Sequence, residues 1–241
     1  MDIVKTETHC EPNLIGRSLT KGLSAAKEYR VAGTVLWLFG CVLVFGYYFV
    51  PTLHHTLEQL GNLKRQSDFV FASVSTGLFG GFLPSLIIKL ASKSSSTRHY
   101  LFSNSLFWAI KGAEIEILYQ LQARAFGDQA DWSVVALKTC FDQFIYVPTI
   151  GIVNVVLFYV WRESRYNCAV FRKRLGSQWY LRRVLPVIVS NWVIWIPAVV
   201  LIYCFPLALQ LPVQNLILCF RVLMLAILTR SEDKEDQQSY S

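Results

Sequence analysis

The feature that most constrains this chain is a charged pair inside an apolar run of membrane length. Residues 134–161 contain only two charged side chains, Lys138 and Asp142, which lie four positions apart and share one face of a helix. Gln143 and Pro148 follow, and the proline is expected to kink the helix because it lacks a backbone amide. Ionisable groups at membrane depth are unfavourable, so they usually face a bundle interior or a water-filled path.

The composition is typical of a protein that crosses a membrane several times. Of the 241 residues, 54% are apolar and 16% are charged, whereas about 25% of the residues of a soluble domain are charged. The charged residues gather at the ends of the apolar segments. This distribution predicts an all-α, polytopic transmembrane helical bundle over residues 31–229, after a polar basic segment (1–30) and before a disordered charged tail (230–241).

Six apolar segments are predicted to be membrane-length helices. The first has no charged residue and spans about 30 Å as a helix, which matches the hydrocarbon core. The third has two polar stripes, so it either crosses among the other helices or lies at the membrane surface. Residues 52–68 are predicted to form a polar connection between the first two. The six segments are 31–50, 69–90, 101–126, 134–161, 184–205 and 213–229.

Small residues recur at every fourth position of the second segment and predict close packing of two helices. The same pattern would also serve a contact between two copies of the chain, so a homo-oligomer is a second interpretation. Three prolines in later segments predict bends that could gate a path. The packing residues are Ser73, Gly77, Gly81 and Ser85, and the prolines are Pro148, Pro197 and Pro206.

Seven polar or charged residues inside the apolar segments form the candidate site. Helical spacing predicts that Lys138 pairs with Asp142. The same argument joins Lys111 to Glu114, and Arg221 would then pair with a carboxylate of another helix. Two interpretations stay open: the groups line a hydrated path for small solutes, or they only hold together a scaffold or assembly protein. The seven residues are Lys111, Glu114, Glu116, Lys138, Asp142, Gln143 and Arg221.

No pattern in the sequence is typical of an enzyme or a metal protein. No His lies in an apolar segment, and no Ser–His or Cys–His arrangement points to a nucleophile. The six Cys residues have no paired short spacing. His54 and His55 are adjacent and would not share a helix face, so they are predicted in an exposed loop. We therefore expect no catalytic residue, no cofactor and no bound metal.

The positive charge of the chain is explained better by a membrane protein than by a protein that binds nucleic acid. The formal net charge is +7, but no nucleic-acid-binding module surrounds the basic residues. With six crossings, sixteen Lys and Arg residues fall on one side, and only Lys64 and Arg65 fall on the other. Both termini are therefore predicted on the cytoplasmic or matrix side. The expected partners are the lipid bilayer and small solutes or ions.

Several motifs resemble those of the Mpv-seventeen / peroxisomal-membrane-protein-twenty-two family of small multi-span membrane proteins. Lys138, Asp142, Gln143 and Pro148 stand at the family's spacing, and the glycine-rich stretch 77–84 is similar to one of its spans. A later cluster also resembles the family: Asn191, Trp192, Trp195, Pro197 and Pro206.

The likeness covers residues 69–229 and is greatest to the longer bacterial members. It implies a channel-like protein that passes small solutes or ions. It favours a bacterial cytoplasmic membrane, with the mitochondrial inner membrane as the alternative.

Reporter fusions at Ser241 test the predicted orientation. In a bacterial host, green fluorescent protein fused there is expected to fluoresce, because it folds on the cytoplasmic side. Alkaline phosphatase fused at the same position is expected to be inactive, because it folds on the other side. An active phosphatase and a dark fluorescent protein would place the C-terminus outside the cytoplasm.

Overall fold

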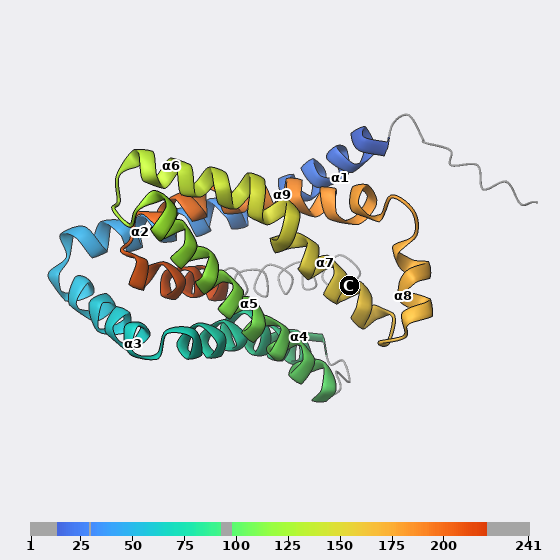
Figure 1. The fold of residues 1–241 in the computed structure, drawn as a ribbon, viewed down its shortest axis with the longest axis horizontal. Coiled ribbons are helices and arrows are strands. Elements are labelled where there is room, and N and C mark those ends of the chain that lie inside the picture. Colours follow the sequence, from blue (N-terminus) through green and yellow to red (C-terminus); the bar gives the residue numbers. More distant parts are fainter. Residues whose placement is uncertain (1–13, 29, 93–97, 221–241) are drawn as a thin grey trace, which may run out of the picture. The chain divides into compact units, whose positions relative to one another are not determined.

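The computed structural model describes residues 14–28, 30–92 and 98–220, and the regular structure in these ranges is helical throughout (Figure 1). The predicted all-α class is therefore confirmed for the described ranges. The elements are α1 (Leu14–Glu28), α2 (Arg30–Phe49), α3 (Pro51–Thr76), η1 (Gly77–Phe82), α4 (Leu83–Ser92), α5 (Arg98–Phe126), α6 (Trp132–Phe141), η2 (Asp142–Gly151), α7 (Ile152–Glu163), α8 (Cys168–Leu175), η3 (Tyr180–Val184) and α9 (Leu185–Tyr203). A further helix, Leu207–Phe220, follows α9.

Three helices of the described ranges are long and apolar enough to cross a membrane: Pro51–Ile87, Trp132–Glu163 and Tyr180–Tyr203. They overlap the second, fourth and fifth predicted segments. The apolar part of α2 is shorter, α5 is not among the three, and the last predicted segment is described only as far as residue 220. Insertion into a membrane is thus supported by three helices, and six crossings stay a prediction.

The predicted polar connection, residues 52–68, is helical and forms the first part of α3. Pro51 occupies the first turn, where the missing amide of a proline is no loss. His54 is exposed, as predicted, but on a helix, and its ring stacks on Tyr47 with 4.6 Å between the centroids. Asp68 interrupts α3 with φ 34° and ψ −103°, which kinks the helix. The polar composition of this stretch hid its helical spacing.

Three wider, π-helical turns, η1, η2 and η3, lie within the long helices. Pro148 lies inside η2, where the wider turn accommodates a residue without an amide. Its carbonyl accepts a hydrogen bond of 2.8 Å from the Tyr180 hydroxyl. Pro197 lies within α9, and Pro206 directly precedes the last described helix, where its carbonyl accepts from the Leu209 amide at 2.8 Å.

The described chain forms two compact units. The smaller unit comprises α1 and residues Gln143–Ile194, and the larger unit comprises Arg30–Asp142 with the described residues from Trp195 onward. A single bundle over residues 31–229 stays a prediction. The buried core of the smaller unit is aliphatic, and aromatic side chains such as Trp179 and Trp192 pack against it. The core residues are Val147, Val156, Val160, Val184 and Ile188.

In the larger unit, α5 packs along α3 and η1 through small residues. A Cβ atom built on Gly81 would lie 2.6 Å from the Ser105 Cα, and one built on Gly77 would lie 3.1 Å from the Ala109 Cβ. Side chains do not tolerate the closer of these approaches. The glycines therefore allow the backbones of the two helices to meet.

Polar contacts strengthen the same helix pair. The Asn104 side-chain amide donates to the Gly81 carbonyl at 3.1 Å and to the Ser85 hydroxyl at 2.9 Å. Ser85 is buried and Ser73, three turns earlier, is half-buried. Gly77, Gly81 and Ser85 of the predicted ladder thus lie against α5 of the same chain.

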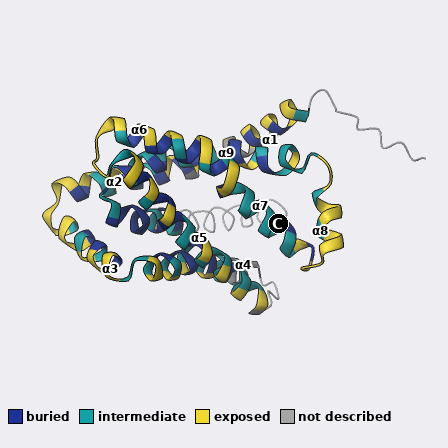
Figure 2. Ribbon diagram, viewed as in Figure 1, coloured by how far each residue is buried: buried dark blue, intermediate teal, exposed yellow. Residues whose placement is uncertain are grey.

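The other face of α5 is apolar and exposed. Its large apolar side chains are between 50% and 67% exposed, while Asn104, Lys111 and Glu116 are buried. This arrangement is the reverse of a helix on the surface of a soluble protein, and it suits a helix surrounded by lipid. Figure 2 shows buried and exposed residues alternating along α6 as well. The exposed stripe of α5 is Phe102, Leu106, Ile110, Ile117 and Leu121.

Replacing Gly112 by alanine is expected to destabilise the larger unit, because the added Cβ would overlap the Ala72 carbonyl oxygen. We expect a loss of about 1–3 kcal/mol in unfolding free energy, measured by thermal unfolding in detergent. The control is Gly16→Ala, since nothing lies within 4 Å of a Cβ at Gly16 and alanine favours a helix. Equal melting temperatures for the two variants would contradict the close approach of α5 and α3.

Candidate functional site

The most enclosed charged group of the larger unit is Glu116 on α5, which is 0% exposed. Its Oε1 accepts from the Lys64 ammonium at 2.5 Å and from the Gln120 amide at 2.9 Å. Lys64 lies on α3 and is 3% exposed. In apolar surroundings an ion pair is strong, while an unpaired charge is very unfavourable. The pair therefore holds α5 against α3.

Lys64 and Gln120 also contact Asp68, the residue at the kink of α3. An Asp68 carboxylate oxygen lies 3.3 Å from the Lys64 ammonium, and the other accepts from the Gln120 amide at 3.1 Å. The positive φ of Asp68 is uncommon for a residue other than glycine and persists where the surrounding contacts hold it. Lys64, Asp68, Glu116 and Gln120 thus form one group, the Lys64 network.

A second buried group surrounds Asp142, the first residue of η2. The Tyr203 hydroxyl of α9 donates to Asp142 Oδ2 at 2.9 Å. Tyr119 of α5 packs edge-on against Tyr203, with 5.6 Å between the ring centroids, and its hydroxyl donates to Gln214 Oε1. Asp142, Tyr203, Tyr119 and Gln214 form the Asp142 network, which joins residues of four helical segments.

One of the two ion pairs predicted from helical spacing forms. The Lys111 ammonium lies 2.6 Å from Glu114 Oε1 on the same helix. Lys138 does not pair with Asp142, because the Tyr203 hydroxyl holds that carboxylate. The Lys138 ammonium instead lies 5.7 Å from the centre of the Tyr203 ring, a cation–π distance. Lys111, on another helix, is a cation that acts electrostatically on Asp142.

Five buried side-chain polar atoms of the larger unit have no hydrogen-bond partner among the described residues: Trp108 Nε1, Glu116 Oε2, Gln122 Oε1, Thr139 Oγ1 and Gln210 Oε1. Gln122 lies beside the Asp142 network, since its amide donates to the Lys138 carbonyl at 3.3 Å. A buried polar atom without a partner raises the free energy by about 1–3 kcal/mol. Such atoms in folded proteins commonly contact ordered water.

The remaining two predicted site residues lie elsewhere. Gln143 belongs to the smaller unit, where its carbonyl accepts from the Trp192 ring at 2.8 Å and its buried Oε1 has no partner in the described ranges. Arg221 lies outside the described residues. Its pairing with Glu116 or Asp142 stays a prediction, although Glu116 already has Lys64 as its cation.

Several residues of the two networks are not among the predicted site residues. Lys64 and Asp68 are four positions apart, as are Glu116 and Gln120. Helical spacing could therefore have predicted the contact within each of these two pairs. The polar composition of residues 52–68 favoured a connection over a packed helix, so the spacing of Lys64 and Asp68 was not used. The network tyrosines have no distinguishing signal, because buried aromatic residues are common in any core.

Among the described residues, no group of three or more His, Cys, Asp or Glu side chains is arranged to hold a metal ion. Comparison with family models, curated proteins and solved structures gave no match. The two networks present ammonium, carboxylate and hydroxyl groups in apolar surroundings. These groups can pair with one another or contact a polar solute.

Replacing Glu116 by glutamine is expected to destabilise the larger unit by about 3–5 kcal/mol, because Lys64 then remains buried with only Asp68 as a counter-charge. The control is Glu163→Gln, because Glu163 forms a half-exposed pair with Arg174 at 3.5 Å, and its loss should change stability by at most about 1 kcal/mol. Denaturant or thermal unfolding in detergent measures both variants.

The double variant Lys64→Gln/Glu116→Gln shows how much of the loss of stability comes from the unpaired charge that remains buried in the single variant. It is expected to recover more than half of the loss caused by Glu116→Gln, because no unpaired charge stays buried. A double variant as unstable as the sum of the two single variants would show that the two residues act independently.

Proposed function

We propose that this chain is an integral membrane protein that passes small solutes or ions by a channel-like route. Three helices of the described ranges are long and apolar enough to cross a membrane. The larger unit buries Lys64, Lys111 and Glu116 behind apolar outer faces. Ionisable groups in such surroundings usually serve a substrate or ion pathway.

The observation that carries the proposal is a set of buried polar atoms that lie beside the charged groups and have no hydrogen-bond partner among the described residues. Glu116 Oε2 belongs to the Lys64 network, and Gln122 Oε1 lies next to the Asp142 network. The carboxylates Glu116 and Asp142 both lie within electrostatic range of the Tyr119 hydroxyl, so the two networks are neighbours. A hydrated path along α5 would give these atoms water as a partner.

The resemblance to the Mpv-seventeen / peroxisomal-membrane-protein-twenty-two family supports the same function, since some of its members behave as channels for small solutes. Lys138, Asp142, Gln143 and Pro148 carry that resemblance. The favoured location is a bacterial cytoplasmic membrane with both termini on the cytoplasmic side, and the mitochondrial inner membrane is the alternative. On this proposal the chain is not an enzyme.

A non-transporting scaffold or assembly protein is the second candidate, and one observation favours it. Lys64 forms an ion pair with Glu116, and Lys111 forms one with Glu114. Such pairs can stabilise the fold without taking part in transport. A partner protein would then bind the basic region 162–183, where α8 has no buried residue and carries Arg172, Lys173 and Arg174.

Recordings from purified protein in a planar bilayer separate the two candidates. The wild type is expected to conduct, and Asp142→Asn is expected to shift the preference between cations and anions, because a fixed negative charge is removed. The control is Asp131→Asn, since Asp131 caps α6 at the exposed surface and asparagine caps a helix equally well.

The outcomes are distinct. Unchanged selectivity in a folded Asp142→Asn protein would move the path away from the Asp142 network. A folded wild type that never conducts, at any voltage or pH tried, would favour the scaffold.

A further inference from the structure

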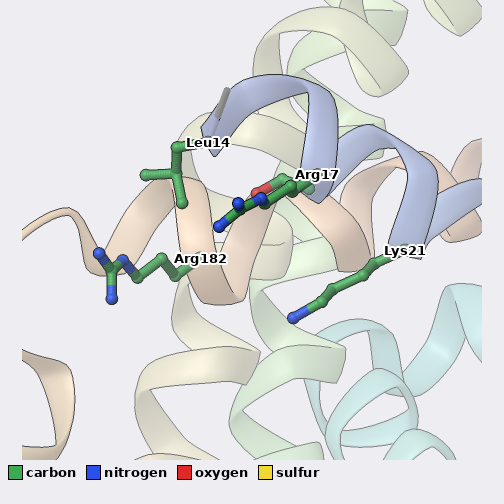
Figure 3. A pocket seen from close by; sticks show the side chains of 5 residues that line it. Leu14, Arg17, Lys21 and Arg182 are labelled. Carbon is green, nitrogen blue, oxygen red and sulfur yellow. The ribbon is translucent and has the colours of Figure 1, made fainter. Parts of the chain in front are cut away.

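The smaller unit contains a basic pocket that uses no residue of the two networks. Its volume is about 320 Å³, and it is lined by residues of α1 and η3 (Figure 3). Pockets of about 300–1,000 Å³ are typical of small-ligand sites. The lining residues are Leu14, Arg17, Ser18, Lys21 and Arg182.

Two close contacts hold α1 in place beside the pocket. The Ser18 hydroxyl donates to the Leu181 carbonyl at 2.6 Å. One turn further on, a Cβ built on Gly22 would lie 2.6 Å from the Val189 Cβ, so the backbone of α1 directly contacts the first turns of α9. The cationic side chains around the pocket therefore extend from backbones that are fixed relative to one another.

The charges around the pocket favour an anion. Arg17 and Lys21 are one helical turn apart on α1, and Arg182 faces the same pocket from η3. The ion pairs of the described residues include neither Lys21 nor Arg182. Cations held close together repel one another, so a bound anion relieves that repulsion. A guanidinium group matches the geometry of phosphate through two parallel hydrogen bonds.

The surroundings of the pocket are those of a membrane surface. Arg182 lies in the first turn of the candidate span Tyr180–Tyr203. Tyr180 and Trp179 come two and three residues earlier, and such aromatic residues gather where a membrane meets water. Beside the pocket, α1 exposes an apolar stripe at every fourth position: Ile15 is 56% exposed, Leu19 39% and Leu23 52%. At the boundary between membrane and water, a phospholipid has its phosphate group next to the beginning of its acyl chains.

We propose that this pocket binds the phosphate of an anionic phospholipid, whose acyl chains lie along the Ile15, Leu19 and Leu23 stripe. Arg17, Lys21 and Arg182 hold the phosphate, and α1 lies in the plane of the membrane surface as an amphipathic helix. The inference rests on insertion of the chain into a membrane and is independent of whether the chain conducts.

The test measures lipid retention by the full-length chain in a neutral detergent. Native mass spectrometry gives the ratio of phosphatidylglycerol to phosphatidylcholine that stays bound from a defined mixture. The wild type is expected to prefer phosphatidylglycerol. Lys21→Gln should reduce the preference about fivefold, and Arg17→Gln/Arg182→Gln about 25-fold, from about fivefold for each cation.

The matched control is Arg172→Gln/Lys173→Gln on α8, which removes the same charge from exposed positions away from the pocket. It should keep the preference of the wild type. Equal losses in the control and in the pocket variants would overturn the proposal, because net charge would then explain the effect. An unchanged preference in a folded Lys21→Gln protein would also overturn it.

A separate arm distinguishes a lipid from free phosphate. Phosphatidylglycerol is expected to raise the melting temperature of the wild type, whereas inorganic phosphate in large molar excess should leave it unchanged. Equal stabilisation by inorganic phosphate would overturn the lipid as the source of the phosphate.

Discussion

The structure of the larger unit depends on one constraint, which is that Glu116 needs a cation. Its carboxylate is 0% exposed, and the Lys64 ammonium at 2.5 Å supplies the counter-charge. Because the partners lie on different helices, α5 must lie against α3 at this level. The small residues complete the contact, since Gly77 and Gly81 of η1, which continues α3, let its backbone approach that of α5 where bulkier residues would hold them apart. Lipid gives helices little hydrophobic reason to associate, so close packing and polar contacts must hold them.

Two irregular points of the backbone coincide with the two polar networks. Asp68, with its positive φ, belongs to the Lys64 network, and Asp142 opens the π-helical turn that contains Pro148. Irregular backbone in an apolar environment is tolerated only where protein or water satisfies the freed polar groups. In the smaller unit, the Tyr180 hydroxyl donates to the Pro148 carbonyl within η2. At these two positions an irregular backbone and a carboxylate of a polar network coincide.

Much of the fold follows from the sequence, because long apolar runs and helical spacing are local properties. The three candidate spans and the Lys111–Glu114 pair belong to this class. The contacts Lys64–Glu116 and Tyr203–Asp142 do not, because in each the two residues lie at least fifty positions apart in the chain. A hydroxyl such as that of Tyr203 can take a carboxylate from a lysine one turn away, and no spacing rule shows which partner prevails. The prediction of a polar connection over residues 52–68 is wrong for a related reason, since a helix can be polar when its charges face another helix.

Ion pairing alone explains the buried charges incompletely. Replacing a buried ion pair by well-packed apolar residues is often neutral or stabilising, so stability gives no strong reason for Lys64 and Glu116 to be charged. The two interpretations diverge at a single atom, Glu116 Oε2, which is buried and has no partner among the described residues. A purely structural pair gains nothing from that oxygen and is penalised for its burial. A path that admits water or a small cation would use it directly, so the unpartnered oxygen is the strongest physical reason to look for conduction along α5.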